Sequence, residues 1–429
     1  MKIFSLCFFI IVLHISCNNS GGEHEADDSL QYYPPTPAVL DRNEFRHYYR
    51  RLNEFLDTAL LNKGFNGGIL VAKNGAVIYE KYQGLIHLGK KDLPAAYLSG
   101  RQGQADSLTA ATPLHIASAT KTFTAAAILR LIQENKLPLT DTLNKFFPGF
   151  PYAGITIQML LCHGSGLPNY LYFMSNEKWD KGPDGKRNRK FASNKDVLTM
   201  LMKKKPDATG KPGARFNYCN TNYVLLALLI EQVTGKPYPE YMRQNWFAPL
   251  QMNNSFVFTL KDTLTATPSF TPSGTYWGYD FLDATYGDKN IYSTPLDMLK
   301  WDKALYTGQI LRPSLLDSAF SPYSFEKQSV HNYGLGWRLQ LLPNGKKVIY
   351  HFGKWHGFNA AFARLTDEKA TIIILGNKFT RNIYNAAHLC YDIFGDYRQR
   401  QVPDADEIDS VKTTLLPRPE KKHIKKRKG

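Results

Sequence analysis

A hydroxyl and an amine stand three residues apart in the segment HIASATKTFTAAAIL, which spans residues 115–129. Ser118 and Lys121 precede an almost wholly apolar stretch, and helical residues at this spacing lie on one face about one turn apart. Two interpretations compete: Ser118 is a helix N-cap and Lys121 a surface residue, or the amine activates the hydroxyl as a nucleophile. The spacing alone does not decide, because it recurs at Ser175–Lys178 and Ser324–Lys327.

Two other short patterns contain the further groups that a nucleophilic serine needs. Tyr218-x-Asn220 is the only Tyr-x-Asn pattern among 25 tyrosines, and His351-x-Gly353 lies on an expected late strand that a tight turn follows. A serine hydroxyl is a weak nucleophile until a base removes its proton, and acyl transfer also needs amide donors for the oxyanion. A lysine and a tyrosine can together accept this proton from the serine and pass it to the leaving group. Ser118 also starts an expected helix, whose N-terminal positive potential favours a developing anion.

Periodicity and turn signals predict the elements that must position these groups. Residues 67–84 predict a β-hairpin with an Asn-Gly turn, and residues 45–60 and 382–395 predict amphipathic helices near the two ends. Short β-rich runs recur over 333–377, whereas residues 155–260 have mainly helical or loop signals. Strands from both ends therefore most simply share one antiparallel β-sheet flanked by terminal helices, with an all-helical domain inserted between them. The predicted fold class is α+β.

The three patterns, in this order, resemble the three motifs of the serine β-lactamase and penicillin-binding-protein superfamily. The likeness is greatest to the class C β-lactamase-related branch, which also contains D,D-carboxypeptidases, D-aminopeptidases and carboxylesterases. The segments ITIQMLLCHGSGLPNY, IYSTPLDMLKWDKAL and YGLGW stand in the expected order between the motifs, and the likeness covers residues 64–378. The resemblance implies a β-lactamase/transpeptidase-like fold and a hydrolase that works through an acyl-enzyme, without cofactor or metal.

The resemblance also implies catalytic roles for residues of the first two motifs. Ser118 is the acylated nucleophile, Lys121 its activating partner and Tyr218 the general base or acid. Which of these groups takes the serine proton is disputed in the superfamily, and the sequence leaves both routes open.

The remaining expected roles concern substrate binding. Asn220 would hold the substrate amide, and His351 stands where many members have lysine. Gly353 completes the third motif. The backbone N–H groups of Ser118 and Lys354 would form the oxyanion hole.

Phe352 departs from the family pattern, since the middle residue of the third motif is usually Thr or Ser. That hydroxyl helps to hold the carboxylate of a β-lactam or of a D-Ala-D-Ala terminus, and an anion left unpaired at a dry site is costly. Unless Lys354 or another cation compensates, the departure disfavours a true β-lactamase. It favours an esterase or amidase acting on D-amino-acid or peptide substrates. The alternative from another class is a penicillin-receptor-like sensor that is acylated at Ser118 without turnover.

The first residues predict export. MKIFSLCFFIIVLHISC has one lysine near its start and then an apolar run too short to span a membrane, which is typical of a secretory signal. Ser16-Cys17 resembles a bacterial lipoprotein cleavage site, although His14 replaces the usual leucine. We therefore expect a signal peptide over residues 1–17 and a lipidated Cys17 that anchors the protein in the bacterial cell envelope. The polar, proline-rich residues 18–44 predict a flexible tether.

The net charge of +16 is concentrated in particular segments, including KKHIKKRK near the C-terminus. This tail lacks aromatic residues and a helical apolar period, so a solvated tail over residues 401–429 is favoured over nucleic-acid binding. An envelope-tethering role for the tail is a third possible function. The expected partners are a small-molecule or peptide substrate and the membrane that holds the lipid anchor.

The body of the chain is expected to form two domains. Residues 45–150 and 275–400 together form the α/β domain, and residues 151–274 form the helical one. After the leader, three widely spaced cysteines remain, an odd set that favours buried thiols over a disulfide framework. No CxxC or HExxH pattern occurs, so the sequence does not predict a zinc site.

Overall fold

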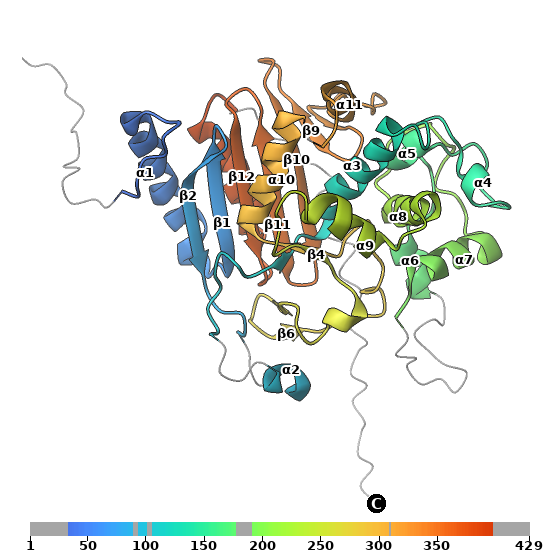
Figure 1. The fold of residues 1–429 in the computed structure, drawn as a ribbon, viewed down its shortest axis with the longest axis horizontal. Coiled ribbons are helices and arrows are strands. Elements are labelled where there is room, and N and C mark those ends of the chain that lie inside the picture. The colour runs from blue at the N-terminus through green and yellow to red at the C-terminus, as the bar shows by residue number, and fades with distance from the viewer. Residues whose placement is uncertain (1–32, 89–92, 101–104, 177–190, 309, 398–429) are drawn as a thin grey trace, which may run out of the picture.

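The structure of the protein, a computed structural model (Figure 1), describes residues 33–88, 93–100, 105–176, 191–308 and 310–397. The predicted signal peptide with Cys17, most of the predicted tether and the basic tail lie outside these residues. Among the described residues, no helix combines the length and the apolar character needed to cross a bilayer. The three cysteines of the described chain, Cys162, Cys219 and Cys390, are free thiols, as the sequence favours.

One antiparallel sheet of seven strands lies at the centre of the fold, in the order β2-β1-β12-β11-β10-β9-β8. Its strands are β1 (Gly67–Lys73), β2 (Ala76–Gln83), β8 (His331–Tyr333), β9 (Arg338–Leu341), β10 (Lys347–Trp355), β11 (Phe358–Leu365) and β12 (Ala370–Gly376). The N-terminal hairpin joins the late strands through β1 and β12, whose register runs from Gly67 opposite Gly376 to Lys73 opposite Ala370. The predicted sheet shared by both ends of the chain is therefore confirmed.

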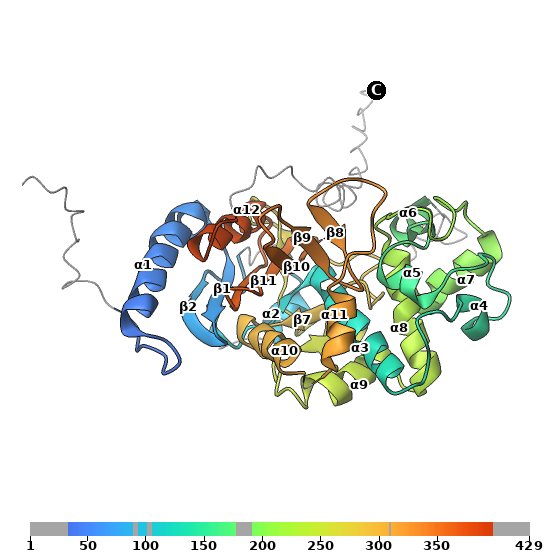
Figure 2. The same ribbon diagram turned by 90° about the horizontal axis from the view of Figure 1, so that it is seen from above.

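The sheet is covered on both faces, so its central strands β10, β11 and β12 are buried along almost their whole length. In β12, Ile374 belongs to the core formed with α1 (Arg42–Ala59) and α12 (Asn382–Cys390), whereas Ile373 belongs to the larger core on the opposite face. Successive strand residues point to opposite faces. Figure 2 shows the two terminal helices together on one side of the sheet, as the sequence predicts.

The opposite face carries the buried helices that present the site. Helix α3 (Thr120–Gln133) is buried along most of its length, and α8 (Asn220–Thr234) is similarly apolar and ends at Gly235, which has a left-handed conformation. Helix α10 (Pro295–Thr307) packs on the sheet itself. The other helices are α2 (Ala95–Ser99), α4 (Leu143–Phe146), α5 (Ile157–Leu161), α6 (Tyr170–Asn176), α7 (Asn194–Lys204), α9 (Tyr238–Met242) and α11 (Pro313–Ala319).

The described residues also form two smaller sheets. One has the order β3-β7-β4, with β3 (Leu114–His115), β7 (Ile291–Ser293) and β4 (Phe256–Val257). The other pairs β5 (Ser269–Phe270) with β6 (Tyr276–Trp277). Strand β3 pairs antiparallel with β7. The residues that follow β3 and lead to Ser118 therefore run alongside the residues that precede Ile291. The expected helical segment 151–274 thus contains helices α5 to α9 and also β4 and β5, and its domain boundaries stay a prediction.

A buried ion pair ties α10 to the sheet. Asp302 accepts hydrogen bonds from the Arg364 guanidinium of β11 and from the Thr371 hydroxyl of β12. The Asp302 and Arg364 side chains are 2% and 1% exposed. Removing one partner of such a pair leaves a charge buried without compensation, which costs far more than losing a neutral hydrogen bond.

We expect Asp302→Ala to lower the free energy of unfolding by about 3–5 kcal/mol, because the Arg364 guanidinium loses its counterion. Thr371→Val is the matched control, since it removes only the second hydrogen bond to the same carboxylate and should cost about 1 kcal/mol. Urea denaturation with an unchanged m-value measures both. A smaller loss for Asp302→Ala than for Thr371→Val would contradict this account.

Candidate active site

Ser118 lies in a tight turn at the entrance of α3. The turn is a 3₁₀ segment over Ala117–Ala119, and Ala117 adopts a left-handed backbone conformation with φ of 48°, which is uncommon for a residue with a side chain. A hydrogen bond from Ile116 N to Ile291 O, 2.9 Å long, holds the turn to β7. The N-cap of α3 is Ala119, so Ser118 is not the capping residue that the alternative interpretation requires.

Lys121 faces Ser118 from the first turn of α3. Its Nζ lies 3.1 Å from Ser118 Oγ and donates a second hydrogen bond, 2.8 Å long, to the carbonyl oxygen of Asp288. The lysine is completely buried, whereas Ser118 is partly exposed. Serine and lysine are therefore in hydrogen-bond contact at a point that substrate can reach, which is the geometry of an activated nucleophile.

Tyr218 completes this group from the loop before α8. Lys121 Nζ lies 5.0 Å from the centroid of its ring, and the guanidinium carbon of Arg338 lies 5.1 Å from the same centroid. His163 packs on the ring with centroids 4.3 Å apart. Two cations, Lys121 and Arg338, thus lie against the ring of Tyr218.

The helix that follows Tyr218 begins at Asn220, which is partly exposed beside the site. The buried Cys219 between them donates its backbone N–H to His163 Nδ1 over 3.1 Å. His163 is completely buried, and burial, followed by the charge of Lys121, holds its pKa well below the usual value. A neutral His163 therefore fixes the Tyr218 loop.

His351 lies beside Tyr218, with ring centroids 6.4 Å apart. Its Nδ1 is 2.8 Å from Phe352 O, which can only accept, so Nδ1 carries the proton and Nε2 accepts the Tyr333 hydroxyl at 3.1 Å. Complete burial, then the charges of Arg338 and Lys121, keep its pKa well below the usual value. The third motif therefore presents a neutral imidazole whose two nitrogens are both hydrogen-bonded to other groups of the protein.

Gly353 brings the third motif against the Ser118 turn. Strand β9 pairs with β10 only up to Tyr350, so the following residues of β10 have a strand partner on one side only. A Cβ on Gly353 would lie 2.5 Å from Ile116 O and 2.7 Å from Ser118 N. Only glycine permits this approach, which brings the two expected oxyanion donors, the N–H groups of Ser118 and Lys354, into one neighbourhood.

Phe352 points away from the nucleophile. Its ring belongs to the core shared with α1 and α12, where it stacks on Tyr384 with centroids 5.6 Å apart and contacts His388 at 5.0 Å. The next residue, Lys354, is 9% exposed, and its Nζ lies 4.7 Å from the centroid of Phe379. Burial, with a smaller effect of Arg381, lowers the pKa of Lys354 to about 8.

The two other Ser-x-x-Lys matches differ from the site. Ser324 lies in a loop and donates to the Glu326 carboxylate, with no helix to set the spacing, and Lys327 is exposed. Lys178 lies outside the described residues, so that match is not described. Of the two matches that the described residues include in full, only Ser118 is in contact with its lysine.

Three residues were not predicted from the sequence and contribute to the site: Arg338, Tyr333 and Asp288. Tyr333 is the first residue of the YGLGW landmark and Arg338 directly follows it. A buried arginine at the start of a strand is the signal that could have identified Arg338. Asp288 acts through its backbone carbonyl, which leaves no signal in residue type.

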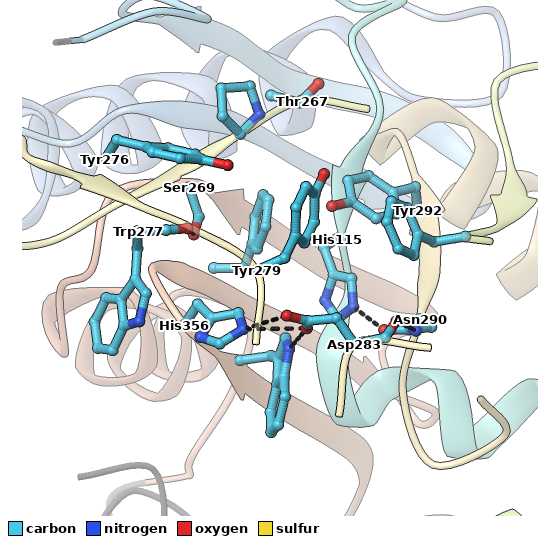
Figure 3. Close-up of a pocket in the computed structure, with 14 residues that line it drawn as sticks. His115, Thr267, Ser269, Tyr276, Trp277, Tyr279, Asp283, Asn290, Tyr292 and His356 are labelled. Atoms are coloured by element: carbon cyan, nitrogen blue, oxygen red, sulfur yellow. Dashed lines mark hydrogen bonds and ion pairs between the residues drawn. The ribbon is translucent and has the colours of Figure 1, made fainter. Parts of the chain in front are cut away.

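One cluster has ligand types that suit a metal. Ligand atoms of Asp280, Asp283 and His356 lie within 4.8 Å of one another. Asp283 and His356 line the pocket shown in Figure 3. His356 Nε2 is 3.0 Å from Asp283 Oδ2, and the indole N–H of Trp355 donates to Asp283 as well. Burial alone would lower the pKa of His356, but Asp283 outweighs it and the net shift is upward. The ion pair between His356 and Asp283 therefore uses the atoms that would bind a metal. These contacts favour a structural cluster over a metal centre.

Comparison with known proteins identifies the class. A family model described as Beta-lactamase matches residues 52–389. Penicillin-binding protein 4* of Bacillus subtilis (strain 168) is 30% identical over 369 residues, which cover 82% of this chain and 75% of that protein. The chain therefore belongs to the β-lactamase family, and it is a serine hydrolase of the β-lactamase and penicillin-binding-protein type.

Solved structures share the fold. The penicillin binding protein from Bacillus halodurans has a TM-score of 0.66 at 22% identity, over 79% of this chain and 99% of that one. The D-amino acid amidase from Ochrobactrum anthropi SV3 has a TM-score of 0.63 at 20% identity, over 81% of this chain and 100% of that one. The resemblance stated from the three motifs is confirmed at the level of family and fold.

The buried, neutral His351 predicts acid sensitivity. Because its folded pKa lies below the unfolded value of about 6.5, unfolding takes up a proton once the pH falls below that value. The stabilisation is present above pH 6.5 and is lost on acidification. We expect the free energy of unfolding to fall between pH 6.5 and 5 more steeply for the parent than for His351→Gln, by up to about 1.4 kcal/mol per pH unit.

Chemical denaturation at pH 5.0, 5.5, 6.0, 6.5 and 8.0 measures this difference. At pH 8 the imidazole is neutral in both states, so the stability difference there reports packing alone. Parallel pH profiles for parent and variant would show that His351 does not change its protonation on unfolding.

Proposed function

We propose that the protein hydrolyses an amide or ester through an acyl-enzyme on Ser118. The observation that carries this proposal is the contact between Ser118 Oγ and Lys121 Nζ, 3.1 Å long, beside the ring of Tyr218. As Ser118 Oγ attacks the substrate carbonyl, its proton passes to Lys121 or Tyr218. The N–H groups of Ser118 and Lys354 hold the oxyanion.

Collapse of the tetrahedral intermediate breaks the bond to the leaving amine or alcohol, which takes the proton from the Lys121–Tyr218 pair. A water molecule then attacks the acyl group, gives its proton to the same pair and releases the acid. In this scheme Asn220 binds the substrate amide, because it lies partly exposed two residues beyond Tyr218.

We further propose that the substrate lacks a free carboxylate next to the scissile bond. The imidazole of His351 is neutral and hydrogen-bonded within the protein, and Phe352 is turned toward α12. The third motif thus lacks the cation and the hydroxyl that would pair with such a carboxylate. An amide of a D-amino acid, a peptide with a blocked end, or an ester fits this site, and the amidase activity named for a structural neighbour supports that class.

We also propose that the enzyme works in the bacterial cell envelope, anchored through a lipid on Cys17. The support is the N-terminal sequence, in which a short apolar run precedes Ser16-Cys17 and a polar segment follows. The body begins after this segment, so a flexible connection would leave the site free to reach substrates near the membrane.

A substrate panel tests the activity. A p-nitrophenyl ester, a D-alanyl p-nitroanilide and a chromogenic cephalosporin are given to the parent and to Ser118→Ala. We expect the ester or anilide to be cleaved faster than the cephalosporin. The alanine variant should lose about three or more orders of magnitude in kcat for whichever substrate is cleaved, because the nucleophile is gone.

Intact-mass measurement after incubation with the cephalosporin tests the two alternative functions, a penicillin receptor and a β-lactamase. A stable adduct on Ser118 with no turnover of any substrate would identify a penicillin-receptor-like protein. Faster hydrolysis of the cephalosporin than of the ester and the anilide would identify a β-lactamase. Full activity of Ser118→Ala would exclude the mechanism.

The lipid anchor has a separate test. Expressed with its leader in a bacterial host, the parent should enter the detergent phase of a Triton X-114 separation, whereas Cys17→Ser should stay in the aqueous phase. The difference follows from the diacyl chains, since two chains give stable membrane binding. Detergent-phase partition of Cys17→Ser would contradict a lipidated Cys17.

A further inference from the structure

We propose that Tyr384, on helix α12, is a positioning residue for the oxyanion hole. Its phenol holds and polarises the peptide group that joins Gly353 to Lys354. The inference rests on the proposed function, which places the N–H of this peptide group at the substrate oxyanion. None of the three motifs contains Tyr384, and it comes from the helix on the far side of the sheet from Ser118.

The contact is a hydrogen bond from Tyr384 Oη to Gly353 O, 2.9 Å long. The described chain has no cis peptide bond, so this carbonyl and the Lys354 N–H point in opposite directions from one planar group. A donor on the carbonyl therefore adds to the β10–β11 pairing in fixing the plane in which the N–H points. It also draws electron density toward the oxygen, which makes the N–H a stronger donor to an oxyanion.

The orientation of the phenol is set by a chain of polar groups. Thr380 N donates to Asn359 Oδ1 over 2.9 Å, which fixes the orientation of that amide, and Asn359 Nδ2 then donates to Tyr384 Oη over 2.7 Å. Because Tyr384 Oη accepts from Asn359, its own proton is directed to Gly353 O. Asn359 is completely buried and lies opposite Lys354 in the β10–β11 register.

Phe352 holds the ring of the same tyrosine. The two rings stack with centroids 5.6 Å apart and planes 22° apart. The residue that departs from the family motif thus packs against the side chain that contacts the next peptide group. We infer that Phe352 and Tyr384 act together: the first orients the ring and the second orients the oxyanion donor.

Anchoring of α12 does not explain the hydrogen bond. Ile383 and Ala387 are completely buried and already pack the helix against the sheet, whereas Tyr384 is partly exposed. A tyrosine used only for packing has no need to place its hydroxyl on the backbone of the third motif. The polar contact is the part that a phenylalanine would lack.

The test compares Tyr384→Phe with the parent in two measurements. With a p-nitrophenyl ester, we expect kcat to fall about tenfold with KM within twofold of the parent, because the interaction acts on the transition state. The dissociation constant of phenylboronic acid should rise by the same factor. In that adduct the Ser118 oxygen bonds to boron, the serine proton passes to the nearby base, and a boronate oxygen occupies the oxyanion hole.

Tyr350→Phe is the matched control. Tyr350 lies in the same aromatic cluster, with its ring 5.1 Å from that of Phe352, and its hydroxyl is 3.4 Å from His331 Nδ1 on β8. The Tyr350→Phe variant should have kcat and a boronate dissociation constant within twofold of the parent. A second variant, Phe352→Leu, should reduce kcat and boronate affinity together, by about threefold, because the Tyr384 ring loses its stacking partner.

The inference is overturned if Tyr384→Phe behaves like Tyr350→Phe in both measurements, or if kcat falls while boronate affinity does not change. Its failure can be told apart from failure of the proposed function, since boronate binding requires no turnover. A parent that binds phenylboronic acid but hydrolyses nothing would contradict the hydrolase proposal alone. The boronate comparison between the variants would still decide the role of Tyr384.

Discussion

The site exists because strand β10 lets the Ser118 turn approach its backbone at Gly353. A side chain at 353 would collide with Ile116 O and Ser118 N, and a longer β9 would cover the edge of β10 that the turn approaches. This single contact joins residues more than two hundred positions apart in the chain. It brings together backbone N–H groups of two segments that neither segment could place alone.

The electrostatics of the site follow from burying cations beside aromatic rings. Lys121 and Arg338 lie against the Tyr218 ring, and both are buried or nearly so. Their charges add to burial in keeping His351 neutral, so the third motif differs in charge from members that have lysine there. The side chain of Phe352 also points away from Ser118, because it packs in the core beside α12. These two differences are the basis of the substrate class that we propose.

Much of the architecture was predictable from local signals. The hairpin over 67–84, the terminal helices and the antiparallel sheet follow from turn chemistry and from periodicities of 2 and 3.6. The sequence shows that Phe352 has no hydroxyl for the third motif, but it did not indicate that the Phe352 ring stacks on Tyr384. Arg338 and Tyr333 were missed because a charged or phenolic residue on a strand has no motif until its neighbours in space are known.

By itself the sequence determined the reactive groups, their order along the chain and the class of fold, since these depend on residue types and short spacings. Only the tertiary structure decided which serine meets its lysine, that His351 is neutral, and that a tyrosine on the last helix contacts the third motif. The physical reason is that burial, charge proximity and hydrogen-bond direction are properties of atoms brought together from distant segments. No local pattern encodes them.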